Sequence, residues 1–385
     1  MGFPVRYLAG ILALLVLLAV VARWRSVEPA STRPFPWPIR YVSGYERGPS
    51  ISAAAAVLME ASTGTVLYAR NEHQPRPPAS TTKIMTALLA LERGHLEQKI
   101  SVSHRAARIG GSSIWLRPGE VLTLEELLQG LLLESGNDAA VAIAEGLAGS
   151  VPAFVALMNQ RARELGAWNT CFANPHGLPE RGRLHYSTAF DLALMTRRAL
   201  EIPRFRELVR SRTAELSADE QGWSRHLRNT NRLLWYFLGA DGVKTGTTRA
   251  AGQCLVASAT RDGWRLIAVV LRSANRWRDA AALLDYGFQN FVPVLLGRWE
   301  DEVARVPVAH GAAPDVGLAP VRDAVVVVRP AEVERLETRL ELPACLAAPL
   351  LPGEVVGRLR VYLDGYELTS FPLTVRTPVC RRFLP

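Results

Sequence analysis

The chain has 385 residues, 49% of them hydrophobic, and a formal net charge of +9 at pH 7. This composition excludes an intrinsically disordered chain, and the length is sufficient for two or three domains. The positive charge would suit a nucleic acid, an anionic membrane or an anionic polymer, but no basic run with interleaved aromatic residues is present, so we expect no nucleic-acid partner.

The first residues have the composition of an export segment. Arg6 precedes an uninterrupted apolar run over residues 8–22, which is short for a membrane span and suits the apolar region of a signal peptide. Residues 1–25 are therefore expected to be either a cleaved signal peptide or an uncleaved membrane anchor, and the Pro-rich residues 26–50 an extended linker. In either case we expect the protein to be exported to the periplasm or cell exterior, and an uncleaved segment would attach it to the cytoplasmic membrane.

Residues 77–94, PPASTTKIMTALLALERG, predict a helix with a serine and a lysine on one face. Ser80 and Lys83 are three residues apart, so the hydroxyl and the amine can meet as a nucleophile and its base. Among the 45 lysine and arginine residues, only Lys83, Lys99 and Lys244 are lysine. A lysine can lose its proton inside a protein whereas an arginine does not, and this favours a base at Lys83.

Two later segments carry further polar groups. Thr123 and Glu126 predict a capping box that begins a helix, which breaks before a second helix at Ser135-Gly136-Asn137. The hydroxyl and the amide on this break can point into a cleft, although an ordinary polar turn is the alternative. The segment DGVKTGTTRAAG then predicts a strand in which Gly246 leaves the edge bare for a substrate backbone.

The motifs SxxK, SxN and KTG follow one another in the order typical of penicillin-binding proteins and class A β-lactamases. Over residues 53–375 the sequence resembles the low-molecular-mass penicillin-binding proteins, which are serine-type D-alanyl-D-alanine carboxypeptidases. The resemblance extends to the blocks PASTTKIMTA, LRPGE, LTLEELLQGLLLESGNDAA, NPHGL, DGVKTGTTRAAG and LVASATRDGWRLIAVVL. It implies an α+β fold. A penicillin-binding/β-lactamase-like catalytic domain, residues 51–293, would contain an antiparallel sheet with helices on both faces plus a helical cluster, and a small all-β C-terminal domain, residues 299–378, would follow.

The resemblance also implies a reaction. Ser80 would attack the carbonyl of the penultimate D-alanine of a peptidoglycan stem peptide and form an acyl-enzyme. Lys83 would be the base, with its pKa lowered by burial and by the charge of Lys244. Ser135 would relay a proton to the leaving amine, and Asn137 would hold the substrate amide.

Further roles follow from the same resemblance. The backbone N–H groups of Ser80 and Thr247 would form the oxyanion hole. Arg278 would bind the terminal carboxylate together with the KTG segment, and Arg276 or Arg249 could take its place. The residues expected to bind the substrate are Lys244, Thr245, Gly246 and Arg278. His176 in NPHGL is expected to have no catalytic role, because the family's chemistry depends on lysine.

No cofactor or metal is expected. The four cysteines lack the spacing of a zinc site, and whether they form disulfides or remain free thiols is open. These cysteines are Cys171, Cys254, Cys345 and Cys380. The sequence departs from the family pattern at Thr247, where close relatives carry histidine, and at the C-terminus, where RTPVCRRFLP is too short for an amphipathic membrane helix.

Several functions remain open at this point. The leading interpretation is a D-Ala-D-Ala carboxypeptidase that β-lactam antibiotics inhibit covalently, and the main alternative is a D,D-endopeptidase that cuts crosslinks. A β-lactamase is less favoured, because no counterpart of the class A deacylating glutamate is recognisable between Asn137 and Lys244. A noncatalytic wall-binding protein would be expected to have lost these motifs, and they are intact.

Overall fold

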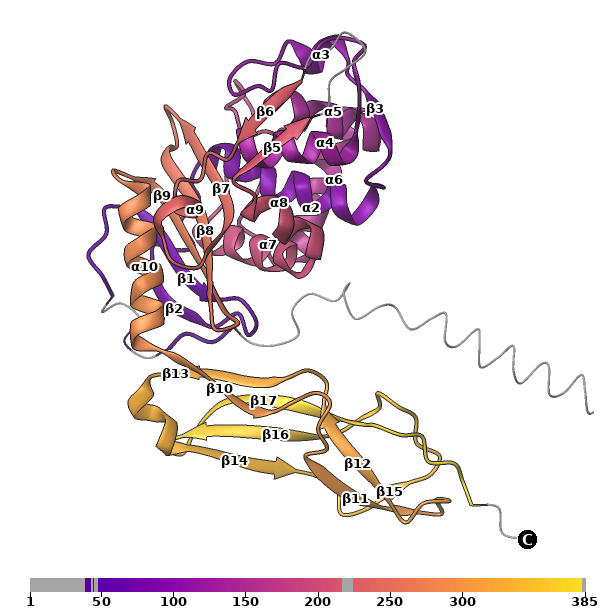
Figure 1. Cartoon of the computed structure of the whole chain (residues 1–385). Helices are drawn as coiled ribbons and strands as arrows, with labels where there is room; N and C mark the ends of the chain where they lie inside the picture. Colours follow the sequence, from indigo (N-terminus) through magenta and orange to yellow (C-terminus); the bar gives the residue numbers. More distant parts are fainter. Residues whose placement is uncertain (1–38, 43, 45–47, 217–223, 383–385) are drawn as a thin grey trace, which may run out of the picture.

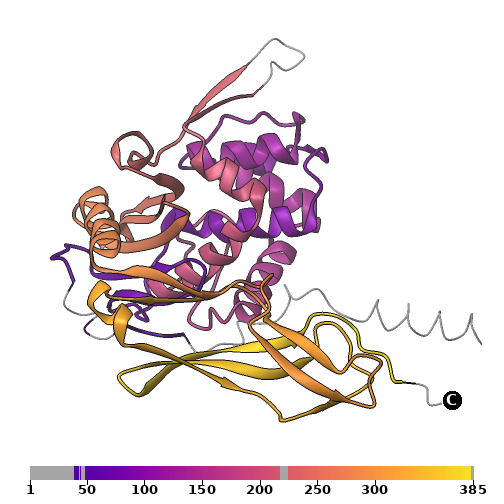
Figure 2. The same ribbon diagram turned by 60° about the horizontal axis from the view of Figure 1, so that its bottom comes forward.

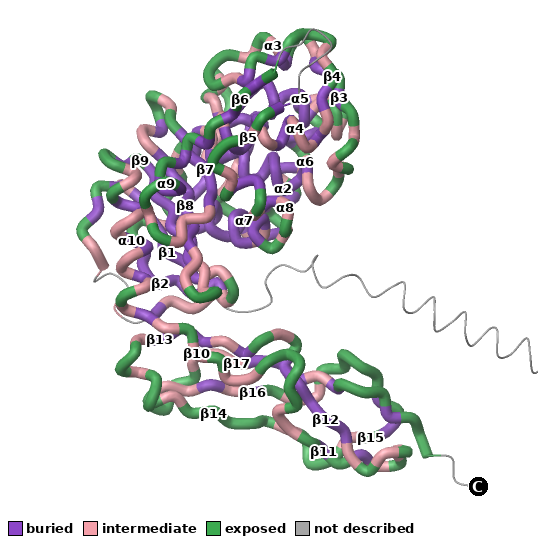
Figure 3. Tube along the Cα trace, viewed as in Figure 1, coloured by how far each residue is buried: buried purple, intermediate pink, exposed green. Residues whose placement is uncertain are grey.

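The chain forms two bodies in the computed structural model, which describes residues 39–42, 44, 48–216 and 224–382 (Figure 1). A domain of mixed helices and strands ends with helix α10, Arg276–Asn290, and an elongated β-domain follows. Buried positions run through the middle of the first domain, whereas exposed positions are more frequent in the second (Figure 3).

The first domain is built on a five-stranded antiparallel sheet with the strand order β2-β1-β9-β8-β7. The turn between β8 and β9 is Asp262-Gly263, whose φ angles are 49° and 78°. Both angles are positive, which an Asp-Gly pair tolerates in a tight hairpin. The strands are β1 (Ala55–Glu60), β2 (Val66–Arg70), β7 (Ala240–Thr248), β8 (Gly252–Arg261) and β9 (Trp264–Ser273).

Helices cover both faces of this sheet. Successive residues of β8, Leu255 and Val256, belong to two different buried clusters because side chains alternate between the faces of a strand. The Leu255 face packs against α10, and the Val256 face packs against α7 and the helical cluster. The helices on this second side are α2 (Lys83–Arg93), α3 (His104–Ala107), α4 (Leu124–Gln129), α5 (Asn137–Ala148), α6 (Val151–Glu164), α7 (Ala189–Glu201) and α8 (Pro203–Arg210).

Smaller elements complete the first domain. The hairpin of β5 (Thr213–Leu216) and β6 (Arg225–Arg228) projects beyond the helices (Figure 2). A two-stranded sheet pairs β3 (Lys99–Ser101) with β4 (Val121–Thr123), and a short helix, α9 (Leu233–Tyr236), precedes β7.

The second domain is all-β apart from one 3-10 helix, Pro330–Arg335. Its larger sheet has the strand order β14-β16-β17-β12-β11-β15, and β10 pairs with β13 in a separate ribbon. Leu318, Val361 and Leu373 lie in its own buried core. The strands are β10 (Val292–Gly297), β11 (Ala304–Ala309), β12 (Asp315–Pro320), β13 (Ala324–Val328), β14 (Leu336–Glu341), β15 (Leu346–Ala347), β16 (Val355–Leu363) and β17 (Tyr366–Val375). The predicted α+β architecture with an all-β C-terminal domain is therefore confirmed.

Three kinds of contact hold the two domains together. Val327 of β13 belongs to the buried cluster that contains α10. Arg322 donates a hydrogen bond to the carbonyl of Ser62 at 3.2 Å. Third, the segment before β1 connects the two domains. The guanidinium of Arg40 donates to the carbonyl of Val327 in the β-domain, and the neighbouring Tyr41 forms a parallel bridge with Val66 in the first domain. The N-terminal end of the described chain therefore lies at the domain junction.

The predicted export segment, residues 1–25, and the first part of the linker lie outside the described residues. Within residues 39–42, 44, 48–216 and 224–382, no single helix combines the length and the apolar composition of a membrane span. The pair α5 and α6 meets that criterion only jointly, across an 88° bend. Both helices contribute residues to the buried core of the first domain.

Candidate active site

Ser80 lies on a short 3-10 helix, Ala79–Thr82, immediately before α2 begins at Lys83. Ala79 has a φ angle of 49°, a left-handed conformation that costs an alanine roughly 1 kcal/mol or more. The next turn is fixed, because the Thr81 hydroxyl donates to the carbonyl of Pro78 at 2.7 Å. A strained residue held by its surroundings directly before the serine is consistent with a functional site.

Lys83 is fully buried, and its amine nitrogen lies within hydrogen-bond distance of three oxygens. Nζ is 2.6 Å from Asn137 Oδ1, 3.0 Å from the carbonyl oxygen of His176 and 3.0 Å from Ser80 Oγ. The first two oxygens can only accept, since Asn137 Nδ2 donates separately to the carbonyl of Gly110 at 2.7 Å. A neutral amine has two N–H groups and one lone pair, so the lone pair is left for the Ser80 hydroxyl.

The electrostatic surroundings favour this neutral form. Burial lowers the pKa of Lys83 well below its usual value, and the charge of Lys244 lowers it further. Burial also lowers the pKa of Lys244 to about 7, with a second contribution from the charge of Arg276. Two buried amines in one site therefore both lose protons far more readily than surface lysines.

Ser135 and Asn137 lie at the predicted helix break. The chain winds into a π-helical turn, Gly130–Glu134, and ends it at Ser135, whose φ angle is 67°. α5 then begins at Asn137. The predicted capping box of Thr123 and Glu126 is present at the start of α4.

Asp138 is a buried carboxylate that the sequence interpretation did not single out. It accepts hydrogen bonds from the backbone N–H groups of Ile114 and Leu116 and from the Ser113 hydroxyl. The backbone N–H of Asn137 donates to the carbonyl of Ser112 at 2.8 Å. Asp138 therefore fixes the loop that holds Asn137 and carries Ser112 into the cavity.

Strand β7 brings the KTG segment against the serine. A Cβ atom on Gly246 would lie 3.0 Å from the backbone nitrogen of Ser80 and 3.0 Å from the carbonyl oxygen of Pro78. Glycine is thus required for the close approach of the strand, rather than only to leave its edge bare. Thr245 Oγ1 lies 2.7 Å from Thr230 Oγ1, which links β7 to the segment before α9.

The arginine beside the site is Arg276, not Arg278. Arg276 donates to the carbonyls of Gly246 and Cys254 at 2.8 and 3.0 Å and to the Thr247 hydroxyl at 2.6 Å. Arg278 is exposed and lies outside the cavity lining, and Arg249 is exposed as well. Arg276 was one of the two alternatives that the sequence left open.

These segments enclose a cavity of about 420 Å³. Ser112, Thr230 and Arg232, together with Gln253 and Trp277, are cavity residues that no motif identified. Lys83, Asn137 and Lys244 lie buried beside it. The lining residues are Ser80, Ser112, Ser135, Thr230, Arg232, Thr245, Gly246, Thr247, Gln253, Arg276 and Trp277.

The ring of His176 is a structural element of the site. Burial lowers its pKa to about 3, and the charge of Lys83 contributes. The ring nitrogen Nδ1 accepts from the backbone N–H of Leu178 at 3.2 Å. The backbone carbonyl of His176, rather than its imidazole ring, contacts Lys83.

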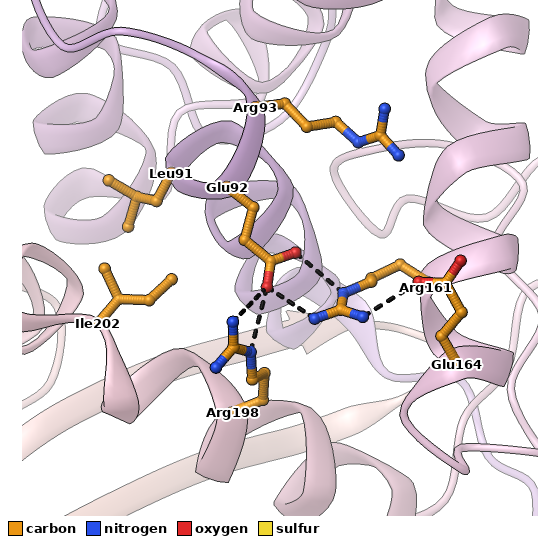
Figure 4. A pocket seen from close by; sticks show the side chains of 7 residues that line it. All are labelled: Leu91, Glu92, Arg93, Arg161, Glu164, Arg198 and Ile202. Atoms are coloured by element: carbon orange, nitrogen blue, oxygen red, sulfur yellow. Dashed lines mark hydrogen bonds and ion pairs between the residues drawn. The ribbon is translucent and has the colours of Figure 1, made fainter. Parts of the chain in front are cut away.

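A second hollow, of about 510 Å³, lies at the other end of α2 (Figure 4). Glu92 accepts hydrogen bonds from Arg161 at 2.7 and 2.9 Å and from Arg198 at 3.1 Å. The three side chains come from α2, α6 and α7 and point toward one another in Figure 4. The cluster therefore joins three helices. Because its charges are paired with one another, we assign it a structural role and not a catalytic one.

Comparisons with known proteins agree with this geometry. Residues 44–275 match the family model described as D-alanyl-D-alanine carboxypeptidase, and residues 296–380 match that of the penicillin-binding protein 5 C-terminal domain. The chain is 38% identical over 336 residues to the D-alanyl-D-alanine carboxypeptidase DacF of Bacillus subtilis, covering 84% of this chain and 85% of that protein. It is 34% identical over 344 residues to DacC of Escherichia coli, covering 85% of this chain and 84% of that protein. The crystal structure of penicillin-binding protein 5 from Haemophilus influenzae superposes with a TM-score of 0.75 at 32% identity, covering 86% of this chain and 99% of that chain.

Proposed function

This chain belongs to the D-alanyl-D-alanine carboxypeptidase family of serine penicillin-binding proteins, and we propose that it removes the terminal D-alanine from peptidoglycan stem pentapeptides through an acyl-enzyme on Ser80. The enzyme is a serine-type hydrolase. The observation that carries the residue assignment is the 3.0 Å contact between Lys83 Nζ and Ser80 Oγ, made by an amine whose other two neighbours are acceptors.

Acylation begins with proton transfer from the Ser80 hydroxyl to the lone pair of Lys83. Ser80 Oγ attacks the carbonyl carbon of the penultimate D-alanine, and the developing oxyanion is stabilised by the backbone N–H groups of Ser80 and Thr247. Their mutual approach depends on the missing side chain of Gly246. Removal of one such donor typically slows a reaction by about a hundredfold or more.

The leaving amine takes its proton through Ser135, and its carboxylate is held by Lys244, Thr245 and Arg276. Arg276 lies at the cavity with its guanidinium already bonded to β7. Asn137 has one N–H bonded to Gly110, so its second N–H is available for the substrate amide. Water then hydrolyses the ester, with Lys83 as the base.

β-Lactams are expected to acylate Ser80 and to remain bound. Among the described residues that line the cavity, none is a carboxylate, so a counterpart of the class A deacylating glutamate is lacking there and hydrolysis of the acyl-enzyme depends on Lys83. This supports the carboxypeptidase over a β-lactamase. For the place of action, we propose the extracytoplasmic side of the cytoplasmic membrane, with residues 1–25 as signal peptide or anchor.

The test combines a substrate with an inhibitor. The purified enzyme should release D-alanine from a pentapeptide that ends in D-Ala-D-Ala, and amidation of the terminal carboxylate should slow turnover sharply. Incubation with penicillin should give a stable mass adduct, and Ser80→Ala should abolish both signals. Rapid turnover of penicillin, or equal rates on free and amidated peptides, would contradict the assignment.

A further inference from the structure

Strand β14 forms one edge of the larger sheet in the β-domain, on the side away from the first domain (Figure 1). It pairs with β16 over six residues, Leu336–Glu341. No strand of the described chain pairs with the other side of β14, so a row of backbone N–H and C=O groups faces outward there. The corresponding edge of the first domain, at β2, is covered, because Val42 donates to the carbonyl of Val66 and Val66 donates to that of Arg40.

The apolar core of the β-domain is open at this edge. Leu340 lies opposite Leu359 of β16, which is buried in the domain core. Residues directly opposite one another point to the same face of a sheet, so Leu340 points to the core side. Leu336, two residues earlier on the same face, packs against that core. Leu340 is nevertheless 47% exposed, and a further strand beside β14 would cover its apolar surface.

The other face of β14 carries charges of alternating sign. The side chains of Glu337 and Arg339 are 59% and 61% exposed and form an ion pair at 3.0 Å within the strand. Arg335, directly before the strand, and Glu341, at its end, are exposed as well. Charges on an edge strand usually discourage pairing with another strand. A partner that brings the opposite charge to each position would remove this obstacle.

A second copy of β14 meets this condition. Let two copies run antiparallel about a twofold axis through Thr338. Leu336 of each copy then lies opposite Leu340 of the other, on the core side of the sheet. On the other face, Glu337 of each copy lies opposite Arg339 of the other. The symmetry repeats each pair, so the contact contains two apolar pairs and two pairs of opposite charge at the centre of the strand.

Charge disfavours the neighbouring registers. With the axis through Arg339, the two copies of Arg339 oppose each other and Glu337 opposes Glu341. With the axis through Glu337, the two copies of Glu337 oppose each other and Arg335 opposes Arg339. Like charges directly opposite one another destabilise a sheet. The pattern therefore selects the axis at Thr338, which also brings Arg335 opposite Glu341.

We propose that the protein forms a twofold dimer in which β14 of one copy pairs with β14 of the other. Backbone hydrogen bonds then continue the larger sheet from one β-domain into the next. Six residues on each side make a small interface, so the association is reversible and depends on concentration. The residues that line the catalytic cavity belong to the first domain and take no part in this contact. The inference therefore does not rest on the proposed function.

The test exchanges the charges at the interface. The mass of the full-length enzyme in detergent is measured by light scattering over a range of concentrations, and the wild type should change from one copy to two as the concentration rises. Glu337→Arg and Arg339→Glu each place like charges opposite one another in two symmetric pairs. Each should raise the dissociation constant of the dimer by about tenfold or more. An equal mixture of the two variants should regain the dimer, because opposite charges meet again.

Glu300→Arg is the matched control. It changes an exposed carboxylate outside β14 and alters the net charge as Glu337→Arg does, so it should dimerise like the wild type. Thermal unfolding verifies that every variant is folded, and penicillin acylation should be the same in all of them. A wild type that remains a single copy at every concentration overturns the proposal. A dimer that survives both single substitutions also overturns it, as does a mixture that associates no better than either variant alone.

Discussion

Lys83 lies among groups that fit a neutral amine, and an arginine cannot supply that form. Lys83→Arg places a permanently charged guanidinium there and removes the lone pair that faces Ser80, so we expect penicillin to acylate the variant on the order of a thousandfold more slowly. The rate is read by intact mass over time. Because a guanidinium is larger than an ammonium and Lys83 is fully buried, thermal unfolding is measured on the same sample.

Lys99→Arg is the matched control, since Lys99 is exposed on β3 and none of the proposed site residues is near it in the sequence. It should acylate at the wild-type rate. A Lys83→Arg enzyme that also acylates at that rate would show that Ser80 uses another base.

Lys244 predicts a pH dependence that depends on the substrate. Burial lowers the pKa of Lys244 to about 7, so this amine is charged below that pH and neutral above it. Binding of a free carboxylate should weaken as the charge is lost, and kcat/KM for the pentapeptide should fall above about pH 7. The amidated peptide makes no such contact, so its profile should lack this alkaline decline. Parallel profiles for the two peptides would contradict a carboxylate role for Lys244.

Short sequence motifs contain most of the residues that the structure brings together at the candidate site. The sequence could not decide between Arg276 and Arg278. Arg276 and Arg278 are equally close to the site in sequence, but residues two apart on a helix point in different directions. α10 begins at Arg276, which turns that side chain toward β7 and Arg278 toward solvent. Thr230 and Arg232 could not be found either, because their contact with the cavity depends on how the segment before β7 folds back.

At the scale of elements, the distance between β7 and the 3-10 helix determines the geometry of the proposed oxyanion hole. Gly246→Ala would place a methyl group 3.0 Å from two backbone atoms, the Ser80 nitrogen and the Pro78 oxygen. Backbone atoms cannot turn aside as a flexible side chain does, so the strand must move outward. We expect a folded enzyme, verified by circular dichroism, whose acylation by penicillin is slower by about a hundredfold. Wild-type acylation would mean that the two donors do not act together.

The helix that carries Lys83 is anchored at its other end by Glu92. Glu92→Ala would leave Arg161 and Arg198 without this carboxylate. We expect the free energy of unfolding to fall by about 2 to 3 kcal/mol, as for loss of a partly buried charged hydrogen bond. The measurement is urea unfolding, with the exposed Glu97→Ala as the control that should change little. Penicillin acylation should persist in the folded protein, since the cluster lies away from the cavity. A loss of acylation at full stability would contradict its structural role.

The sequence predicted features that depend on neighbouring residues better than features that depend on packing between distant segments. The turn Asp262-Gly263 and the capping box at Thr123 were predictable because each depends on residues close in sequence. The π-helical turn before Ser135 and the loop held by Asp138 were not. Both depend on packing between segments far apart in the chain, although a carboxylate directly after Asn137 could have indicated a buried acceptor.

At the scale of the whole molecule, the two ends of the described chain lie in different places. Residues 40 and 41 contact the domain junction, and the last described residues pair with the β-domain: the carbonyl of Cys380 accepts from Ala312, and the N–H of Arg382 donates to His310. Figure 1 shows the last described residues at the end of the β-domain farther from α10. A tether on the N-terminal side would therefore hold the molecule at its junction, whereas a C-terminal tether would hold it at the far end of the β-domain.

We propose the first of these arrangements, because residues 8–22 form an uninterrupted apolar run of the kind that enters a membrane. Exchange of residues 1–25 for a cleavable signal peptide should move the exported enzyme from the membrane to the soluble fraction. Removal of residues 380–385 should leave it with the membrane. This removal costs the two backbone hydrogen bonds of Cys380 and Arg382, so thermal unfolding is compared as well. A folded C-terminal truncation that becomes soluble while residues 1–25 are intact would place the attachment at the C-terminus instead.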